Sequence, residues 1–379
     1  MLCVYVVCSN STNLQFSTCL VFGNADSGEG YINVDGNEGD RKNLTLWQNA
    51  EEMISTVASE CNNTIVVLHT VGPVLVEAWA DHPNVTAILW AGLPGQESGN
   101  SLVDVLYGAV NPGAKTPFTW GKTREDYGAA LITVPNNGAG APQQNFTEGI
   151  FVDYRHFDKS NITPRWEFGY GLSYSSFQFS NIEVQCLKAP PYTPATGQTK
   201  PAPTLGKAGT AADYLIPKGF HEVPLYIYPY LNSTDLKASS GDPHYGWPTD
   251  QYVPPHATDS SAQPINPAGG APGGNPHLYD EVAQVTVTIE NTGKFAGDEV
   301  AQLYISLGGP DDAPKVLRGF ERLTLRPGQS TKWTATLVRR DIMNWDTASQ
   351  NWVVTNYPKT IYVGRSSRDL PLQAPLNLA

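Results

Sequence analysis

Residues 64–70, with the sequence TIVVLHT, form a continuous apolar run. Such a run is typical of a strand that is buried on both faces of a parallel sheet. Two similar runs lie on either side of it, at residues 19–22 (CLVF) and 85–90 (VTAILW). Apolar residues recur at helical spacing over residues 46–59 and again over residues 97–107. Strands that alternate with helices predict an α/β domain with a mostly parallel sheet.

The ends of these elements also carry signals. Residues 45–48 resemble a capping box for the first helix, and Gly108 is a stop signal for the second. We expect Leu102, Val103, Val105 and Leu106 on the inner side of that helix. Residues 74–79 suggest a short helix, and residues 115–120 are predicted to form the last strand of the sheet.

The second half of the chain follows a different pattern. Residues 121–180 are rich in aromatic residues, Gly, Asn and Pro, which predicts ordered loops. Short alternating strands, separated by turn signals at 291–293 and 326–328, predict a β-sandwich of immunoglobulin or fibronectin type III architecture. We expect these strands at residues 174–184, 283–290, 300–306, 315–325, 330–338 and 360–363. Residues 187–279 are dense in Pro, Gly, Ala, Ser and Thr and are expected to be a long irregular insertion.

Charge and composition narrow the class of partner. The chain has 379 residues and a formal net charge of −12. An acidic surface argues against nucleic acid and against anionic membranes, and it fits an uncharged ligand. No apolar run approaches the roughly 20 residues that cross a bilayer. The five cysteines allow one or two disulfides with a thiol left over, and neither they nor the seven histidines have the spacing of a metal site.

Asn-x-Ser/Thr sequons are frequent, which indicates a glycosylated, secreted protein. We expect glycosylation candidates at Asn43, Asn62, Asn84, Asn145, Asn161 and Asn232, and a further sequon starts at Asn10. The N-terminus does not show the signal peptide that secretion requires. Residues 1–18 are therefore expected to be an atypical segment that is not part of the fold.

Glu29 is the main candidate for chemistry. It lies between Gly28 and Gly30 in a loop that follows the first expected strand, and Tyr31 is two residues from it. Glycines let a ligand approach the backbone closely, and a carboxyl group in that position can serve as a general acid/base. An ordinary surface turn is the alternative. A nucleotide-binding loop is disfavoured, because Asn33 replaces the third glycine of that motif.

Other polar residues have simpler interpretations. Asp26 is too close to Glu29 along one loop to face it across a sugar, and we expect it to hydrogen-bond the loop backbone. Glu97 and Ser98 are expected to serve a helix N-terminus rather than a nucleophile elbow. His69 is expected in the core. Packing is also the expected role of most of Trp47, Trp79, Trp90 and Trp120. Asp35, Glu38 and Asp40 lack the spacing of a calcium loop.

Several motifs closely resemble fungal β-glucosidases of glycoside hydrolase family 3, and the resemblance runs from about Cys19 to the C-terminus. Its motifs are Asp26-Ser-Gly-Glu29-Gly-Tyr31-Ile, the stretches 36–44 (GNEGDRKNL) and 90–100 (WAGLPGQESGN), Asp153-Tyr-Arg-His-Phe157, the stretch 167–174 (EFGYGLSY), Leu317-Arg-Gly-Phe320 and Trp345-Asp346.

This resemblance implies a division into parts. Members of this type have a (β/α)8-like barrel, then an α/β sandwich, then a fibronectin type III domain, and only the last two are matched here. Residues 19–160 would be the α/β sandwich and residues 161–379 the fibronectin type III-like domain. The first strand of the latter would lie near 174–186, and the insertion would span 187–279.

The resemblance also implies roles for residues. Glu29 matches the acid/base, and Tyr31 matches the aromatic residue on the aglycone side. The nucleophilic Asp belongs to the barrel, so activity of this chain alone is expected to be negligible.

The implied function is a retaining β-glucosidase of cellulose breakdown that acts on cellobiose and short β-glucosides. It would need no cofactor and no metal, and it would be secreted. Its partners would be β-linked glucose oligosaccharides, with neither nucleic acid nor membrane, and a homodimer is the assembly to consider. The alternative is a non-catalytic module that binds carbohydrate or has a structural role. A third option is complementation by a separate barrel chain.

Overall fold

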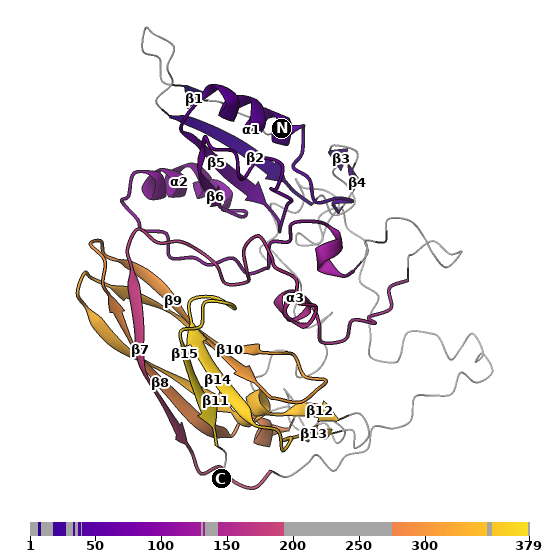
Figure 1. The fold of residues 1–379 in the computed structure, drawn as a ribbon, viewed down its shortest axis with the longest axis vertical. Helices are drawn as coiled ribbons and strands as arrows, with labels where there is room; N and C mark the ends of the chain where they lie inside the picture. Colours follow the sequence, from indigo (N-terminus) through magenta and orange to yellow (C-terminus); the bar gives the residue numbers. More distant parts are fainter. Residues whose placement is uncertain are drawn as a thin grey trace, which may run out of the picture. The chain divides into compact units, whose positions relative to one another are not determined.

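The computed structural model describes residues 7–8, 18–27, 33–34, 37–38, 40–129, 132, 143–192, 275–346 and 351–377. In these ranges the first half of the chain forms a four-stranded sheet in the order β1-β2-β5-β6 (Figure 1). Strands β2 (Cys19–Ala25), β5 (Thr64–Thr70) and β6 (Val85–Trp90) are parallel. These are the three strands predicted from the apolar runs, and the mostly parallel sheet is confirmed.

The short strand β1 (Val7–Cys8) lies at one edge of this sheet. It pairs antiparallel with β2, and Val7 lies opposite Leu20. Residues 1–18 are expected to lie outside the fold. Of these residues, the structure describes only 7, 8 and 18. The position of the domain boundary therefore stays a prediction.

Helix α1 (Ala50–Glu60) covers one face of the sheet, with Ala50, Ile54 and Ala58 buried along one stripe. The predicted start near residue 46 is wrong. Gln48 and Asn49 have φ angles of 55° and 56°, so the chain is left-handed immediately before the helix.

The predicted capping box is also absent, because the Thr45 hydroxyl donates a hydrogen bond to the side chain of Asn43 instead. The short helix expected at residues 74–79 is not formed, and only a turn at residues 77–81 is present in its place.

The strand expected at residues 115–120 is not formed. Only Trp120 pairs, in an isolated bridge with Trp166, whose carbonyl accepts a hydrogen bond from the Trp120 amide at 2.8 Å. The two indole rings pack edge to face at 5.4 Å. The apolar character of this segment therefore reflects the packing of Phe118 on Trp90 and of Trp120 on Trp166 in the core, rather than a strand of the sheet.

Helix α2 (Ser98–Leu106), with a preceding 3₁₀ turn η1 (Gly95–Glu97), agrees with the helix predicted over residues 97–107. Its expected inner side does not pack as predicted. None of its residues is buried, and Val103 is 51% exposed. Gly108, which follows the helix, has a φ of 77° and ends it as expected.

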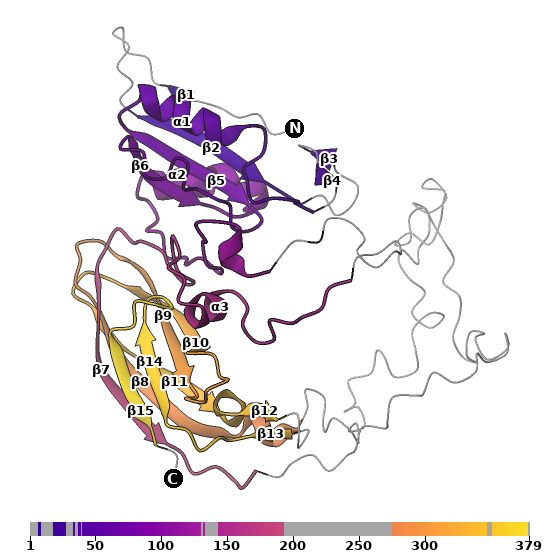
Figure 2. The same cartoon turned by 45° about the vertical axis from the view of Figure 1, so that its right-hand side comes forward.

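The second half of the chain forms a sandwich of two antiparallel sheets (Figure 2). One sheet contains β7 (Phe177–Cys186), β8 (Glu281–Asn291) and β11 (Ser330–Val338). The other contains β9 (Gly297–Ser306), β10 (Val316–Leu325), β14 (Lys359–Gly364) and β15 (Leu372–Leu376). Burial alternates along β8, whereas β9 is buried along most of its length. The sandwich core includes Val285, Val287, Ile289, Leu303, Ile305 and Ile361. This confirms the predicted β-sandwich.

Several short elements were not predicted. Helix α3 (Tyr154–Lys159) and the 3₁₀ turn η2 (Glu125–Tyr127) lie in the region expected to be loops. The remaining ones are η5 (Pro276–Tyr279), η6 (Arg339–Ile342), the pair β12 (Asn344–Asp346) and β13 (Asn351–Val353), and the pair β3 (Asn33–Val34) and β4 (Asn37–Glu38).

Side-chain contacts join residues of the first half to β9. The Lys115 ammonium and the Glu299 carboxylate form an ion pair at 2.8 Å, and Glu299 is almost fully buried. The Asn111 side chain donates to the carbonyl of Ala296 at 3.2 Å.

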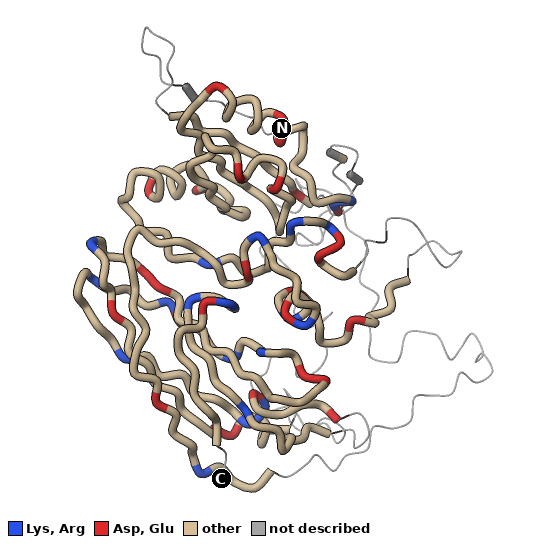
Figure 3. The backbone as a smooth tube through the Cα atoms, in the orientation of Figure 1, with Lys and Arg blue, Asp and Glu red and all other residues tan. Residues whose placement is uncertain are grey.

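Lysine and arginine positions are interspersed with acidic positions along the chain, as Figure 3 shows.

Residues 192–278 form a separate unit, most of which lies outside the described residues. The chain enters it after β7 and leaves it before β8, and these two strands pair directly.

No helix in the described ranges has the length and apolarity needed to span a bilayer.

A disulfide joins Cys19, at the start of β2, to Cys61, directly after α1, and closes a loop of 42 residues. Replacing both cysteines by Ser is expected to lower the free energy of unfolding by about 4 kcal/mol, because the cross-link restricts the unfolded chain. Urea denaturation with and without reductant measures the loss. Cys186→Ser is the matched control, since Cys186 is an exposed free thiol. An unchanged midpoint in the double variant would contradict the expectation.

Candidate functional site

The predicted loop leaves the sheet at the carboxyl end of β2. Glu29 and Tyr31 themselves lie outside the described residues, but both ends of their loop are described. The Ser27 amide donates to the Asp26 carboxylate at 2.7 Å, as expected for a residue that holds the loop backbone. The Ser27 hydroxyl donates to the carboxylate of Asp40. The stem of the loop is therefore closed by a direct contact between Ser27 and Asp40.

The neighbouring strands end at the same edge of the sheet. The Trp90 indole N–H, at the end of β6, donates to the Thr70 hydroxyl at 2.9 Å. The Thr70 hydroxyl, at the end of β5, donates to the carbonyl of Gly72 at 2.7 Å. The Val71 amide donates to the carbonyl of Ala25 at 3.1 Å. In open α/β sheets, ligands bind at this carboxyl edge, so the stem of the Glu29 loop stands where such a sheet forms a site.

Arg41 fixes the returning end of the loop. Its guanidinium donates to the carbonyl of Pro73 at 3.0 Å. A Cβ atom at Gly72 would lie 3.2 Å from Nη2 of Arg41, so the glycine allows this close approach. Burial lowers the pKa of Arg41, while the nearby Tyr127 acts in the opposite direction. Arginine stays charged at neutral pH despite such a shift, so the Pro73 contact is charge-assisted.

Tyr127 lies against the segment that precedes it. Its hydroxyl accepts a hydrogen bond from the Gly121 amide at 2.8 Å and donates to the carbonyl of Thr119 at 3.2 Å. Burial raises the pKa of Tyr127 to about 12. The phenol is therefore neutral at ordinary pH and acts as a fixed link in this segment.

Asp153 connects two segments of the chain, the one at Thr119 and the start of α3. Its carboxylate accepts hydrogen bonds from the Thr119 amide at 3.1 Å, the Thr119 hydroxyl at 2.7 Å and the Tyr154 amide at 2.5 Å. The backbone of Asp153 is unusual, with φ 53° and ψ −137°. A non-glycine residue in this region is strained, and the surrounding contacts must hold it there.

The two carboxylates described at the loop stem, Asp26 and Asp40, both have a structural role. Asp26 and Asp40 both accept hydrogen bonds from Ser27, so each one holds the stem. Among the described residues, no group of three or more His, Cys, Asp or Glu side chains could hold a metal ion. Asp35, one of the three acidic residues that lack the spacing of a calcium loop, lies outside the described residues.

Two family models match the chain. Residues 9–154 match the glycosyl hydrolase family 3 C-terminal domain, and residues 299–367 match a fibronectin type III-like domain. β-Glucosidase A of Aspergillus kawachii is 65% identical over 360 residues, which cover 95% of this chain and 42% of that protein. The chain therefore contains a domain of glycosyl hydrolase family 3, over residues 9–154.

Solved structures of family 3 agree with this assignment. A β-glucosidase from Chaetomium thermophilum has 57% sequence identity and a TM-score of 0.74, covering 94% of this chain and 43% of that chain. A β-D-glucoside glucohydrolase from Trichoderma reesei has 39% sequence identity and a TM-score of 0.72. The match covers 96% of this chain and 40% of the Trichoderma reesei chain. This chain therefore spans about two fifths of the length of these relatives.

The other sequence candidates of this chain have structural roles. Trp47, Trp79 and Trp120 are buried in the α/β core, as expected. Glu97 precedes α2 and accepts a hydrogen bond from the Asn100 side chain at 2.7 Å, without capping the helix backbone.

His69 is half-buried and stacks on Phe22, and burial lowers its pKa. Its Nε2 has no hydrogen-bond partner among the described residues, so it is not the fully satisfied core histidine that we expected.

Sequence reasoning did not single out Arg41, Tyr127 or Asp153 as individual residues. Two of them, Arg41 and Asp153, fall inside motifs that carry the family resemblance. Their roles depend on partners distant in the chain, such as Pro73 for Arg41 and Thr119 for Asp153, which spacing alone does not reveal.

Tyr127→Phe should change how stability depends on pH. The pKa of Tyr127 is raised in the folded chain, so its contribution is fully present below pH ~10 and is lost as pH rises toward 12. The variant should lose less stability than the wild type between these pH values, as measured by urea denaturation at stepped pH. Tyr107→Phe, at an exposed tyrosine, is the control and should follow the wild type. Identical slopes for Tyr127→Phe and wild type would refute this role.

Asp153→Ala should lower the free energy of unfolding by about 3 kcal/mol, because it leaves buried donors of Thr119 without their acceptor. Asp153→Asn should lose less, since an amide oxygen can still accept and Asn tolerates positive φ. Thermal and urea denaturation compare the two variants. Equal losses would show that the carboxylate contacts do not stabilise the chain.

Proposed function

We propose that this chain is the acid/base-carrying part of a retaining β-glucosidase. The reaction would be hydrolysis of terminal non-reducing β-D-glucosyl residues of cellobiose and short β-glucosides, in cellulose breakdown. The observation that carries this proposal is the match to the family 3 C-terminal domain, which includes the Glu29 loop at the carboxyl edge of the sheet. Relatives of which this chain spans about two fifths are named β-glucosidases.

The proposed chemistry needs a proton donor that is held firmly but can reach a bound sugar. Glu29 would protonate the oxygen of the leaving aglycone, and later activate the water that releases glucose. Tyr31 would lie against the aglycone. The stem contacts of Ser27, Asp40 and Arg41 support this role, because they fix both ends of the loop.

The second carboxylate of a retaining pair lies about 5–5.5 Å from the first, across the sugar. The family resemblance attributes it to a barrel domain. We infer that the 379-residue chain by itself has negligible activity. Without a nucleophile no glycosyl-enzyme intermediate can form, and the glucose site lacks most of its wall.

Secretion and glycosylation belong to the same proposal. The sequon residues Asn43, Asn62, Asn145 and Asn161 are exposed. Asn84 is half-buried and its side chain donates to the carbonyl of Ala58 at 2.8 Å, so it is the weakest acceptor among the described sequons. Asn232 lies outside the described residues. The Cys19–Cys61 disulfide also favours an oxidising compartment.

The decisive test compares this chain alone with a fusion that joins it to the N-terminal part of the Aspergillus kawachii relative. The fusion should hydrolyse cellobiose, and the chain alone should not. In the fusion, Glu29→Gln should lower kcat by roughly 10²–10⁴ for cellobiose. The loss should be smaller for an aryl glucoside with a good leaving group, which needs little protonation.

Asp26→Asn in the fusion is the matched control, because Asp26 holds the loop backbone and should keep the leaving-group dependence of the wild type. The acid/base assignment is wrong if Glu29→Gln leaves cellobiose turnover intact. The need for a barrel is wrong if the chain alone hydrolyses an aryl glucoside well above its own Glu29→Gln variant.

A further inference from the structure

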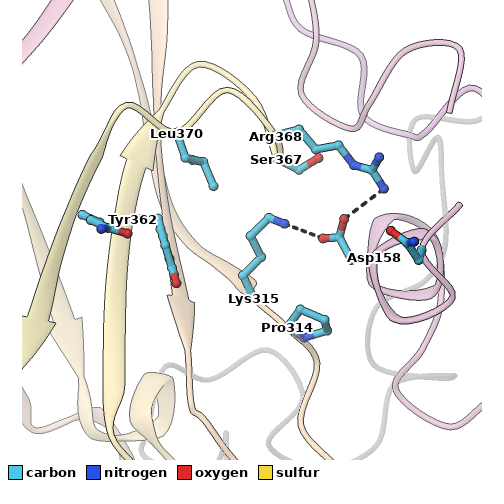
Figure 4. A pocket seen from close by; sticks show the side chains of 9 residues that line it. Asp158, Pro314, Lys315, Tyr362, Ser367, Arg368 and Leu370 are labelled. Carbon is cyan, nitrogen blue, oxygen red and sulfur yellow. Dashed lines mark hydrogen bonds and ion pairs between the residues drawn. The ribbon is translucent and has the colours of Figure 1, made fainter. Parts of the chain in front are cut away.

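An open hollow of about 450 Å³ lies between α3 and the β-sandwich (Figure 4). Tyr362 and Leu370 lie on one side of it, Asp158 and Arg368 on the other, and Lys315 extends between them. These residues come from four separate parts of the chain. The function proposed above does not use any of them.

Three charged side chains form a network on one side of the hollow. Asp158 accepts from Lys315 at 2.6 Å and is paired with Arg368 at 3.2 Å. The Asp158 side chain is only 8% exposed, so it is fixed by these partners. A carboxylate has about four acceptor sites, an ammonium three donors and a guanidinium five. The contacts within the network therefore do not use all the donors and acceptors of these three groups.

Ser367 provides a second, independent observation. It lines the hollow and is 1% exposed, and its hydroxyl has no hydrogen-bond partner among the described residues. A buried hydroxyl without a partner is unfavourable, and such groups in folded proteins often mark a place for a missing water or ligand.

The lining combines flat apolar surfaces with planar polar groups. The ring of Tyr362, the ring of Pro314 and the side chain of Leu370 are apolar, while Arg368 and the amide of Gln373 are planar and polar. A pyranose ring presents C–H faces and a rim of hydroxyl groups. Hydroxyls can pair with the carboxylate, ammonium and amides, while the C–H face packs on an aromatic ring.

We propose that this hollow binds a pyranose ring of an uncharged saccharide. An anion fits less well, because the carboxylate of Asp158 lies between the two cations and neutralises one of them. The site is independent of the proposed function. It would exist whether or not Glu29 is an acid/base.

The sugar can come from two sources. One is a free oligosaccharide of β-linked glucose. The other is an N-linked glycan of this chain, because Asn161 begins the sequon Asn161-Ile162-Thr163 and lines the hollow itself. A glycan on Asn161 would therefore start beside this hollow.

The free source is tested with the full 379-residue chain made without glycosylation, which is inferred to have negligible activity and therefore leaves the saccharide intact. Binding of cellotriose is followed by titration in NMR spectra and should be saturable. Tyr362→Ala should weaken binding roughly two- to tenfold, and Tyr362→Phe, which keeps the ring, should retain it. Gln373→Ala, at an exposed position, should also weaken it. Phe320→Ala, at an exposed aromatic residue of β10 outside the hollow, should bind like the parent.

The glycan source is tested with the chain secreted from a eukaryotic host. Mass spectrometry shows whether Asn161 is occupied, and Thr163→Ala removes the sequon while keeping Asn161. Two results support the proposal. In the first, Asn161 is occupied and its glycan blocks cellotriose binding and protects Tyr362 in NMR spectra. In the second, free cellotriose binds saturably and its binding depends on Tyr362. The proposal is overturned if cellotriose binding is absent or unaffected by Tyr362→Ala and no glycan contacts Tyr362. These binding measurements do not depend on hydrolytic activity. Their outcome therefore leaves the acid/base assignment of Glu29 unchanged.

Discussion

The carboxylate of Asp153 holds the start of α3 to the α/β core, and it is one of the contacts that connect the two folded parts. It accepts hydrogen bonds from the amide and hydroxyl of Thr119 and from the amide of Tyr154. Thr119 precedes Trp120, which is buried in the α/β core. Tyr154 begins α3, and its hydroxyl accepts a hydrogen bond from the Leu317 amide of β10 at 3.0 Å. One side chain thus ties the core of the α/β domain to a strand of the β-sandwich, and the strained backbone at Asp153 is the cost of that geometry.

The candidate site is built in the same way, from fixed points around a loop. The three parallel strands bring Ala25, Thr70 and Trp90 to one edge, since each of these strands ends there. Ser27 and Asp40 join the two ends of the loop, and Arg41 ties the returning chain to Pro73. The disulfide at Cys19 and Cys61 encloses the whole segment, from the start of β2 to the end of α1. The rigid elements thus set where the loop begins and ends, and the chemistry is left to residues within it.

The sequence predicted best those elements that local pattern alone determines. The run at 64–70 could only be a doubly buried strand, and it became β5 with the same bounds. The start of α1 was misplaced because Gln48 and Asn49 adopt positive φ, which apolar periodicity does not report. Residues 115–120 have strand-like composition, yet Trp120 packs on Trp166 across 46 residues of chain, a tertiary contact that no local window contains.

Glu29 was identified by its glycine-flanked position and by the family resemblance. The hollow at Asp158 and Tyr362 could not be found from sequence, because its residues come from distant segments and no single one of them is unusual.

The pairing of β7 with β8 has a consequence for how this family can change. Cys186 lies opposite Ala283 in adjacent antiparallel strands, so the points where the intervening residues leave and rejoin the sandwich are neighbours in space. The entropy of closing a loop between two fixed ends rises only with the logarithm of its length, by about 0.6 kcal/mol for each doubling. Insertions and deletions between these strands therefore leave the sheet register intact. This connection is a place where the length of the protein can evolve almost independently of its fold.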